Sequence, residues 1–463
     1  MTWNARITKE QEQDIAAVTA AKADILNTRS LLGVAGTYNP GDPFVNRSPS
    51  RYNAGNLVSR ISFDATAKLT DLGTPASAVV TLDSENTLHA ADMPGVSLKF
   101  AKTTAGTSAE ARHTLAAPTD VNHNVMVLRF YLHPGAGVTA ADKLSYVEVT
   151  LFDHTHGYVS THKSVFKIWV SANLATTDAN GVSGWYCIPV CLDCPTSIGG
   201  TAAATLTEIE IIKIVVVPVA DMTANIPIIT LDAIEFYTSP FAAAWYSIRI
   251  DSGTTNALDM AEDLKDLSVK ATFAIQPGTI GTTGYMTFAN LVTVQGWGHQ
   301  LALYSGDYPT WTAWASKTEA QKRNLLSTAA AWCLANGLPV SLARTVCASG
   351  GSGFIPHDRL LFQEARIKQF CGLDGSYAIA TGELETAFRP EVMHTGYFID
   401  VVTGDTTPAA VTALIALAAT AKLGISLGSH IATANQRATL LACVADLKTA
   451  TFTNKTWADL LVL

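Results

Sequence analysis

The pattern of hydrophobic and polar positions changes character twice along this 463-residue chain. Residues 8–32 place Ile15, Val18, Ile25 and Leu32 at an approximate three-four spacing, which predicts one helix within an N-terminal segment, 1–35. So few heptads agree equally with a short coiled-coil stem that gathers several copies and with a helix packed against its own chain.

Two turn-rich stretches separate this helix from the rest of the chain. Residues 36–56 contain Pro, Gly, Ser and Asn in the proportions of a linker loop, and Ser239 and Pro240 mark a second boundary. Between them, over 57–240, short β runs follow one another with almost no helical periodicity. This pattern predicts a central antiparallel β-sandwich. The clearest strands are predicted at 125–132, 146–152, 165–170, 209–219 and 226–237. Of these, 228–237 resembles the last strand of jelly-roll carbohydrate-binding modules.

Strands and helices alternate over 241–463. A strand at 247–250 precedes an amphipathic helix at 257–267 and a second strand at 270–275. Ser316 and Glu319 have the spacing of a capping box for a helix that runs to Asn336. A further helix is expected from Pro408 to Gly424, before a strand at 425–427. The alternation predicts a parallel sheet or an incomplete βα barrel, whose site would lie at the carboxyl ends of the strands.

Charge and cysteine content narrow the range of functions. The 31 basic and 39 acidic side chains give a net charge of -8 without a basic block, so nucleic acid is a poor partner. We find no signal peptide and no apolar run of the ~18 residues that a membrane span needs, so we expect no membrane insertion. Seven cysteines suggest reduced thiols and synthesis in a cytosol. Cys187, Cys191 and Cys194 approach metal spacing, but no fourth ligand stands nearby, and buried thiols are favoured.

Polar residues stand at three strand boundaries of the C-terminal region. Asp251 follows the strand that ends at Ile250, His299 lies in a turn before a short strand, and His430 ends the strand at 425–427. Carboxyl ends of parallel strands meet at one edge, so these tips are expected to converge in one cleft. The alternative for Asp251 is a cap of the helix that follows it.

The same stretches resemble polysaccharide deacetylases. Arg249-Ile-Asp-Ser-Gly253 is similar to the first motif of that family, usually Thr-Phe-Asp-Asp-Gly. Gly298-His-Gln-Leu-Ala-Leu-Tyr-Ser-Gly-Asp-Tyr308 resembles the second, and the strand that ends at His430 resembles the fifth. Arg344 and Asp400 represent the third and fourth motifs of the family in this sequence. The resemblance covers about 220 residues and implies a distorted βα barrel of the deacetylase type.

The resemblance places Asp251 at the catalytic base and His430 at the general acid. Ser252, Tyr304 and Tyr308 stand where the family has its metal-binding Asp, His and His, and neutral hydroxyls are poor zinc ligands. We therefore expect no metal and no cofactor. Zinc lowers the pKa of water by ~9 units, worth on the order of 10 kcal/mol, whereas an acid and a base supply ~3 to 5 kcal/mol.

A cleft without the metal would still present hydroxyls, carboxylates and aromatic faces suited to sugars. We expect His299, Tyr304, Tyr308, Ser252 and Trp297 to bind ligand there. We also expect this of Arg344 and Asp400. Elsewhere, His154 and His156 share one face of an expected strand and begin a metal pattern, but no third ligand is evident. They are expected to be solvent-facing polar residues.

The whole layout resembles bacteriophage tail fibres and tailspikes. It implies a homotrimeric virion receptor-binding protein, made in the host cytoplasm and attached to other tail proteins through its N-terminal segment. Its partner would be bacterial surface polysaccharide, and its C-terminal domain would be a pseudoenzyme. Two alternatives stay open. One is an active polysaccharide deacetylase or other carbohydrate esterase that modifies capsule or O-antigen, and the other is a secreted bacterial glycan-binding protein.

Overall fold

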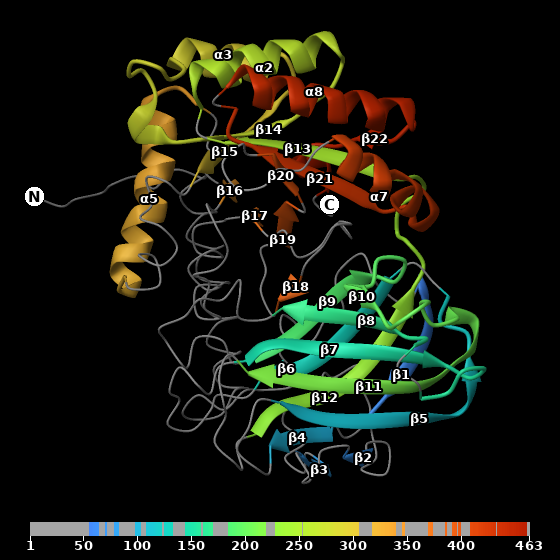
Figure 1. The fold of residues 1–463 in the computed structure, drawn as a ribbon. Helices are drawn as coiled ribbons and strands as arrows, with labels where there is room; N and C mark the ends of the chain where they lie inside the picture. The colour runs from blue at the N-terminus through green and yellow to red at the C-terminus, as the bar shows by residue number, and fades with distance from the viewer. Residues whose placement is uncertain are drawn as a thin grey trace, which may run out of the picture.

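The computed structural model contains an all-β domain and an α/β domain (Figure 1). The continuous segments that it describes are 55–63, 108–122, 125–132, 144–158, 161–169, 184–218, 227–251, 253–304, 317–338, 408–431 and 433–460. Isolated strands are described at 70–71, 78–82, 98–102, 345–347, 369–373, 385–386, 391–395 and 397–399. The predicted helix at 8–32 and nearly all of the predicted linker lie outside these residues.

Two antiparallel sheets form the β domain, and each contains segments from distant parts of the sequence. Sheet A has the order β18-β9-β6-β12-β4-β3, with β1 paired to β12, and sheet B has the order β10-β8-β7-β11-β5-β2. The strands of sheet A are β1 Leu57–Ser62, β3 Ala78–Leu82, β4 Leu98–Lys102, β6 Val125–Leu132, β9 Gly184–Cys191, β12 Pro227–Tyr237 and β18 Glu385–Thr386. Those of sheet B are β2 Thr70–Asp71, β5 Ala109–Thr119, β7 Leu144–Asp153, β8 Ser164–Trp169, β10 Ser197–Ile198 and β11 Ile209–Pro218.

Alternation along the strands builds the core between the two sheets. On β6, Met126, Leu128 and Phe130 point inward and are fully buried, and the inward residues of β7 and β11 meet them from the other sheet. Successive side chains of a strand point to opposite faces, so the intervening residues form the outer faces of the sandwich. The prediction of two antiparallel sheets packed face to face is confirmed, whereas the jelly-roll connectivity stays a prediction.

The α/β domain is built on a parallel sheet. Its strand order is β19-β17-β16-β15-β14-β13-β21-β20, and β22 pairs with β13. The strands are β13 Trp245–Asp251, β14 Thr272–Ile275, β15 Gln300–Tyr304, β16 Thr345–Cys347, β17 Gln369–Leu373, β19 Glu391–Thr395, β20 Tyr397–Ile399, β21 Gly424–Ser429 and β22 Thr453–Asn454. The helices are α2 Thr255–Asp266, α3 Phe288–Gly296, α5 Glu319–Ala335, α7 Pro408–Ala421, α8 Ala434–Thr449 and α9 Trp457–Leu460. The predicted parallel sheet is confirmed.

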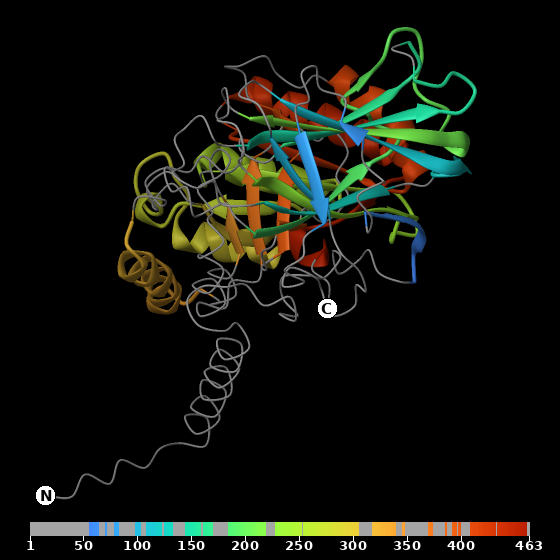
Figure 2. The same cartoon turned by 90° about the horizontal axis from the view of Figure 1, so that it is seen from below.

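Threonine side chains start most of these helices. Thr287, Thr318 and Thr433 each accept a hydrogen bond from the third residue of the helix that follows, whose own side chain returns a bond to the backbone N–H of the threonine. These are capping boxes, which satisfy two backbone donors at each start. For α5 the box is Thr318 with Gln321, so the predicted pairing of Ser316 with Glu319 was two residues too early. Helix α5, in orange, lies at the periphery of the molecule (Figure 2).

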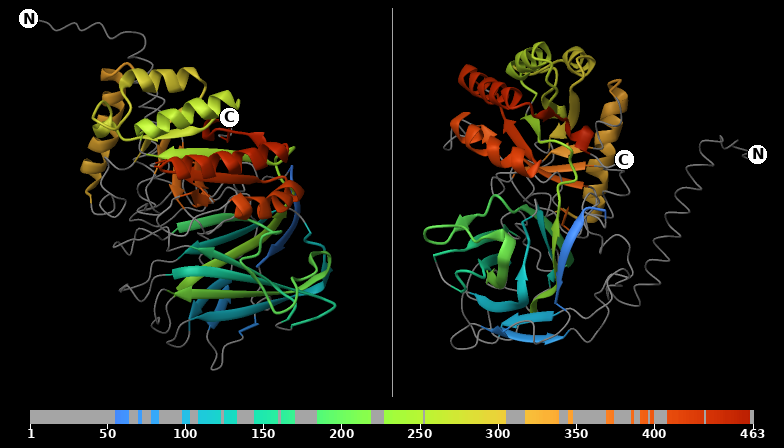
Figure 3. Two further views of the ribbon diagram at one scale, coloured as in Figure 1. Left: turned by 45° about the horizontal axis from the view of Figure 1, so that its top comes forward. Right: turned by 90° about the vertical axis from the view of Figure 1, so that its right-hand side faces the viewer.

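One face of the parallel sheet packs against helices α2, α3 and α8 (Figures 1 and 3). Ile248 and Ile250 of β13 and Leu427 of β21 face this core, with Met260 of α2 and Leu440 of α8 on the helical side. All five side chains are fully buried. The opposite face of the sheet therefore carries the alternate residues of the same strands.

The two domains share part of their packing. The core of the α/β domain continues into Val125, Val127, Cys191 and Tyr237, all on the outer face of sheet A. Strand β18, which follows β17 in the sequence, adds an edge strand to β9 of the sandwich. The domains predicted as 57–240 and 241–463 are thus interleaved at one strand. No helix in the described part of the chain is long and apolar enough to cross a membrane.

Candidate functional site

The register of the parallel sheet brings Asp251 and His430 to the same edge. Ile250 of β13 pairs with Ser429 of β21, so Asp251 and His430 each follow a paired residue at the carboxyl end of neighbouring strands. Asp251 also pairs with Ala274 of β14 on its other side. This is the edge at which parallel βα folds place their sites.

The face of the sheet that points away from the helices is polar at this place. Ser247, Arg249 and Asp251 alternate with the isoleucines of β13, and all three are fully buried. Ser247 donates a hydrogen bond to Ser426 of β21, with 2.9 Å between the two oxygens. Small residues stand beside Arg249 in register on the neighbouring strands, Thr272 on β14 and Gly428 on β21, so this face of the sheet is built from several strands. Its further members are Thr272, Ala274, Gln300, Ala302 and Gly428.

Asp251 is held by an internal ion pair. Arg249 Nε donates to Asp251 Oδ1 at 2.5 Å, and the two residues lie two positions apart on one face of β13. Asp251 Oδ2 is buried and has no hydrogen-bond partner among the described residues. Burial raises the pKa of Asp251, while the charges of Arg249 and, to a smaller extent, His430 act in the opposite direction.

The described residues at this site do not suit a divalent cation. The Arg249 guanidinium, a permanent positive charge, already occupies one oxygen of the only carboxylate at this strand edge that the structure describes. Among the described residues, no three His, Cys, Asp or Glu side chains lie close enough together to hold a metal ion. The described residues therefore provide no site for a divalent cation at this edge.

The alternative interpretation of Asp251 as a helix cap is wrong. Thr254 caps α2, accepting a hydrogen bond from the backbone N–H of Ala257 at 3.3 Å. Asp251 belongs to the strand, and Gly253 turns the chain between them with a φ of +63°, in the left-handed region that favours glycine. The Asp251 carboxylate therefore lies on the polar face of the sheet and takes no part in capping α2.

His299 does not lie with Asp251, contrary to the prediction. It precedes β15, at the amino end of the strands, and its exposed fraction is only 3%. The backbone N–H of Ala271 donates to Nδ1 at 3.1 Å, so Nε2 carries the proton and donates to the Ala261 carbonyl at 3.0 Å. Burial lowers the pKa of His299. Its two nitrogens therefore connect α2 to the residue that precedes β14.

Trp297 is also at the wrong edge of the sheet for the predicted role. It caps the carboxyl end of α3, two residues before His299, and packs against the helical core. Lys265 Nζ lies 5.1 Å from the centre of its ring, a cation–π contact. The side chains of the remaining predicted ligand residues lie outside the described residues. These are Ser252, Tyr304, Tyr308, Arg344 and Asp400.

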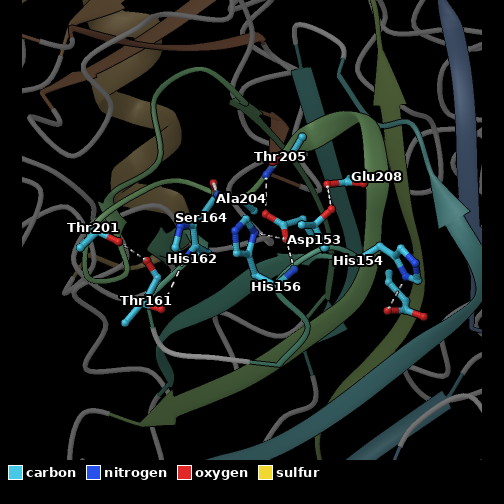
Figure 4. A network of polar contacts seen from close by, with 12 residues as sticks. Asp153, His154, His156, Thr161, His162, Ser164, Thr201, Ala204, Thr205 and Glu208 are labelled. Atoms are coloured by element: carbon cyan, nitrogen blue, oxygen red, sulfur yellow. Dashed lines mark hydrogen bonds and ion pairs between the residues drawn. The ribbon is translucent and has the colours of Figure 1, made fainter.

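The histidines after β7 form a separate polar network (Figure 4). They lie in a turn and not on a strand, and they contact different acids. His154 Nδ1 lies 3.1 Å from Glu210, whereas His156 Nδ1 lies 2.7 Å from the buried Asp153 and its ring stacks on His162 with 3.7 Å between centroids. Burial of Asp153 would raise its pKa, but hydrogen bonds from the backbone N–H groups of Thr205 and His156 outweigh burial and lower it. The predicted placement on one strand face is wrong, whereas both histidines are solvent-exposed, as predicted.

Two of the three clustered cysteines are close together. Cys191 ends β9 and is buried, and the backbone N–H of Cys194 donates to its carbonyl at 3.3 Å across a turn. A hydrogen bond between the two thiols and burial raise the pKa of Cys191, while the same bond lowers that of Cys194. Both are free thiols, as predicted, and the Cys187 side chain lies outside the described residues.

Sequence reasoning missed Arg249, although the strand contains a signal for it. A charged residue inside the mostly apolar run 245–250, two residues before Asp251, shares a strand face with that carboxylate. The stacking of His162 on His156 had no comparable signal, because it depends on a turn that the sequence does not define.

The chain is similar to known proteins in its structure and not in its sequence. No protein-family model matches the sequence, and no curated protein matches it. The similar solved structures include family 4 carbohydrate esterases, polysaccharide deacetylases and a carbohydrate-binding module.

Three of the similar structures illustrate the extent of this similarity. A family 4 carbohydrate esterase from Bacillus anthracis has 16% identity and a TM-score of 0.31, over 49% of this chain and 86% of its own. A family 4 carbohydrate esterase from Streptomyces lividans, in complex with acetate, has 12% identity and a TM-score of 0.31, over 46% and 92%. A family 11 carbohydrate-binding module from Clostridium thermocellum has 10% identity and a TM-score of 0.27, over 39% and 94%.

Proposed function

We propose that this chain binds a polysaccharide without hydrolysing it, at the carboxyl edge of the parallel sheet where Asp251 and His430 lie. The observation that carries the proposal is the ion pair of Arg249 with Asp251. It leaves a polar, strand-built site in place and binds the carboxylate that a hydrolase would use as its base.

The chemistry available at this site argues against hydrolysis. A general base must take the proton of an attacking water, but Asp251 shares Oδ1 with the Arg249 guanidinium, whose positive charge acts against protonation of that carboxylate. Activation of that water by zinc would supply on the order of 10 kcal/mol, and the described residues at this edge provide no ligand set for zinc. A general acid and base together contribute about 3 to 5 kcal/mol.

The same groups suit sugar hydroxyls. A buried carboxylate oxygen without a partner costs about 1 to 3 kcal/mol, and a hydroxyl that donates to Asp251 Oδ2 would offset that cost. His430 is half-buried at the neighbouring strand end and has a ring that donates or accepts hydrogen bonds. An alternating set of acceptors and donors is what a polyhydroxylated ligand requires.

The biological setting is a further part of the proposal. We propose a receptor-binding protein of a phage virion, made in the host cytoplasm and directed at bacterial surface polysaccharide. The helical spacing at 8–32 supports a homotrimeric stem that attaches to other tail proteins. A mass measurement of the purified chain tests this assembly, and a monomer at all concentrations would contradict it.

Activity measurements separate this proposal from an active deacetylase or esterase. Acetylated capsular or O-antigen polysaccharide from candidate hosts is incubated with the full chain, with and without chelator, and bound polymer and free acetate are measured. We expect chelator-resistant binding, no acetate release, and about tenfold weaker binding for Asp251→Asn, which loses the charge that holds Arg249 in place. Acetate release that disappears in Asp251→Asn would establish the enzyme instead.

A further inference from the structure

The outer face of sheet B carries charged and aromatic side chains at the positions that alternate with its core residues. Ala111, Val149 and Ile212 point into the sandwich core, so the residues between them point outward. This surface is on the opposite side of the sandwich from the outer face of sheet A, which packs against the α/β domain. The outward residues with polar or aromatic side chains are Glu110, Arg112, Tyr146, Glu148, Thr150, Phe152, Lys167 and Lys213.

Two cations lie directly opposite each other on this face. Lys213 of β11 pairs in register with Arg112 of β5. Like charges at directly paired positions destabilise a sheet, so this arrangement has a cost in the free protein. Lys213 Nζ is 3.9 Å from Glu110, at the limit of an ion pair. Arg112 has no acidic partner among the described residues, and its Nε is buried there without a hydrogen-bond partner.

Tyrosine rings contact two of the cations on this face, Arg112 and Lys167. The Arg112 guanidinium carbon lies 5.4 Å from the centre of the Tyr158 ring, which packs on Phe152 with 4.7 Å between centroids. Lys167 Nζ lies 4.9 Å from the centre of the Tyr146 ring. Tyr158 is 43% exposed, so the guanidinium is oriented at a surface that a ligand can reach. A cation that is already oriented loses less entropy when it binds an anion.

The acidic residues of this face are already engaged. Thr150 donates a hydrogen bond to Glu148 at 3.1 Å, and Glu110 lies beside Lys213. Among the described side chains of this face, Arg112 is thus the cation without an acidic partner. The planar fork of a guanidinium matches the two oxygens of a carboxylate, and a paired ammonium adds charge without demanding a fixed geometry.

We propose that the outer face of sheet B is a second binding site, which takes an acidic polysaccharide and holds a uronate carboxylate between Arg112 and Lys213. The sugar backbone would then lie along the Tyr158 side of the face. This site is separate from the edge that contains Asp251, and it does not depend on the function proposed there.

Matched polymers test the proposal. Binding of the full chain to polygalacturonate, alginate and hyaluronan is measured by calorimetry, each beside its carboxyl-reduced form, which keeps the backbone and removes the charge. We expect at least one uronate polymer to bind about tenfold or more tightly than its reduced form. Arg112→Gln should abolish this difference, and Arg112→Lys should restore part of it. Equal affinity for charged and reduced forms of all three polymers would overturn the proposal.

Two control variants separate this site from general charge effects and from the other site. Lys422→Gln removes one exposed positive charge from the α/β domain and should leave uronate binding unchanged. Asp251→Asn should also leave it unchanged, whereas it weakens the binding proposed at the parallel sheet. Loss of uronate binding in Asp251→Asn but not in Arg112→Gln would place the acidic ligand on the α/β domain and overturn the inference. Thermal unfolding of each variant establishes that it is folded.

Discussion

At the scale of single residues, the buried pair of Arg249 and Asp251 is the feature with the largest energetic consequence. Both side chains have no exposed surface, so each charge has lost its hydration and depends on the other. A buried pair contributes little compared with apolar residues of the same size, but removal of one partner leaves an uncompensated charge. The pair therefore makes the two positions strongly dependent on each other.

Substitution of one partner should cost much more than substitution of both. Arg249→Met leaves the Asp251 carboxylate unpaired and should lower the free energy of unfolding by about 3 to 5 kcal/mol at neutral pH. The double variant Arg249→Met with Asp251→Asn has no buried charge and should recover most of that loss. Denaturant unfolding of the wild type, both single variants and the double variant gives the coupling energy. Additive losses would contradict the ion pair.

The pH dependence of the single variant follows from the same pair. Burial raises the pKa of Asp251, and loss of the opposing Arg249 charge should raise it further. A carboxyl group with a raised folded-state pKa contributes stability below its unfolded value of ~3.9 and loses it as pH rises through the folded value. The defect of Arg249→Met should therefore be smallest below about pH 4 and grow toward neutrality, whereas the double variant should lack this dependence.

At the scale of elements, close contact between neighbouring strands depends on residues without a side chain. Gly424 begins β21 opposite Trp245 of β13. A Cβ atom at Gly424 would lie 2.3 Å from two carbons of the Trp245 indole, which is fully buried and cannot swing away. The glycine is thus required by the approach of an aromatic ring and not by its own backbone conformation.

Gly424→Ala should accordingly destabilise the α/β domain by about 2 to 3 kcal/mol, because the core must shift to admit one methyl group. Gly296→Ala is the matched control, since no atom lies within 4 Å of the added Cβ at the end of α3. That change should be neutral or stabilise by up to ~1 kcal/mol, because alanine has the higher helix propensity. Thermal unfolding compares the two. Equal midpoints would contradict the contact with Trp245.

Strand alternation made much of this architecture predictable, and tertiary contacts account for what was missed. The apolar periodicity identified the antiparallel sandwich, the parallel sheet and the strand that ends at Asp251. The edge of the sheet at which a polar residue lies was harder to predict: His299 stands at the amino end of β15, whereas Asp251 stands at the carboxyl end of β13. A histidine with both nitrogens bonded to backbone groups has the same sequence signature as a ligand-binding one.

At the scale of the whole molecule, the shared packing at the outer face of sheet A should couple the two domains. Val127 is fully buried in the core that contains β13 and α2, although it belongs to a sandwich strand. Its neighbours Met126 and Leu128 point instead into the sandwich. A change at Val127 therefore reaches the junction and leaves the sandwich core intact.

The wild-type chain should unfold in one calorimetric transition, because a continuous core allows neither domain to unfold alone at low cost. Val127→Asn places an amide in that apolar junction, where an unpaired polar group costs about 1 to 3 kcal/mol. We expect two resolved transitions in this variant, with the sandwich transition close to that of the wild type. Val292→Asn is the control, because Val292 is 58% exposed on α3, and its profile should match the wild type. A single unshifted transition in Val127→Asn would show that the domains are joined by the connecting chain and not by their packing.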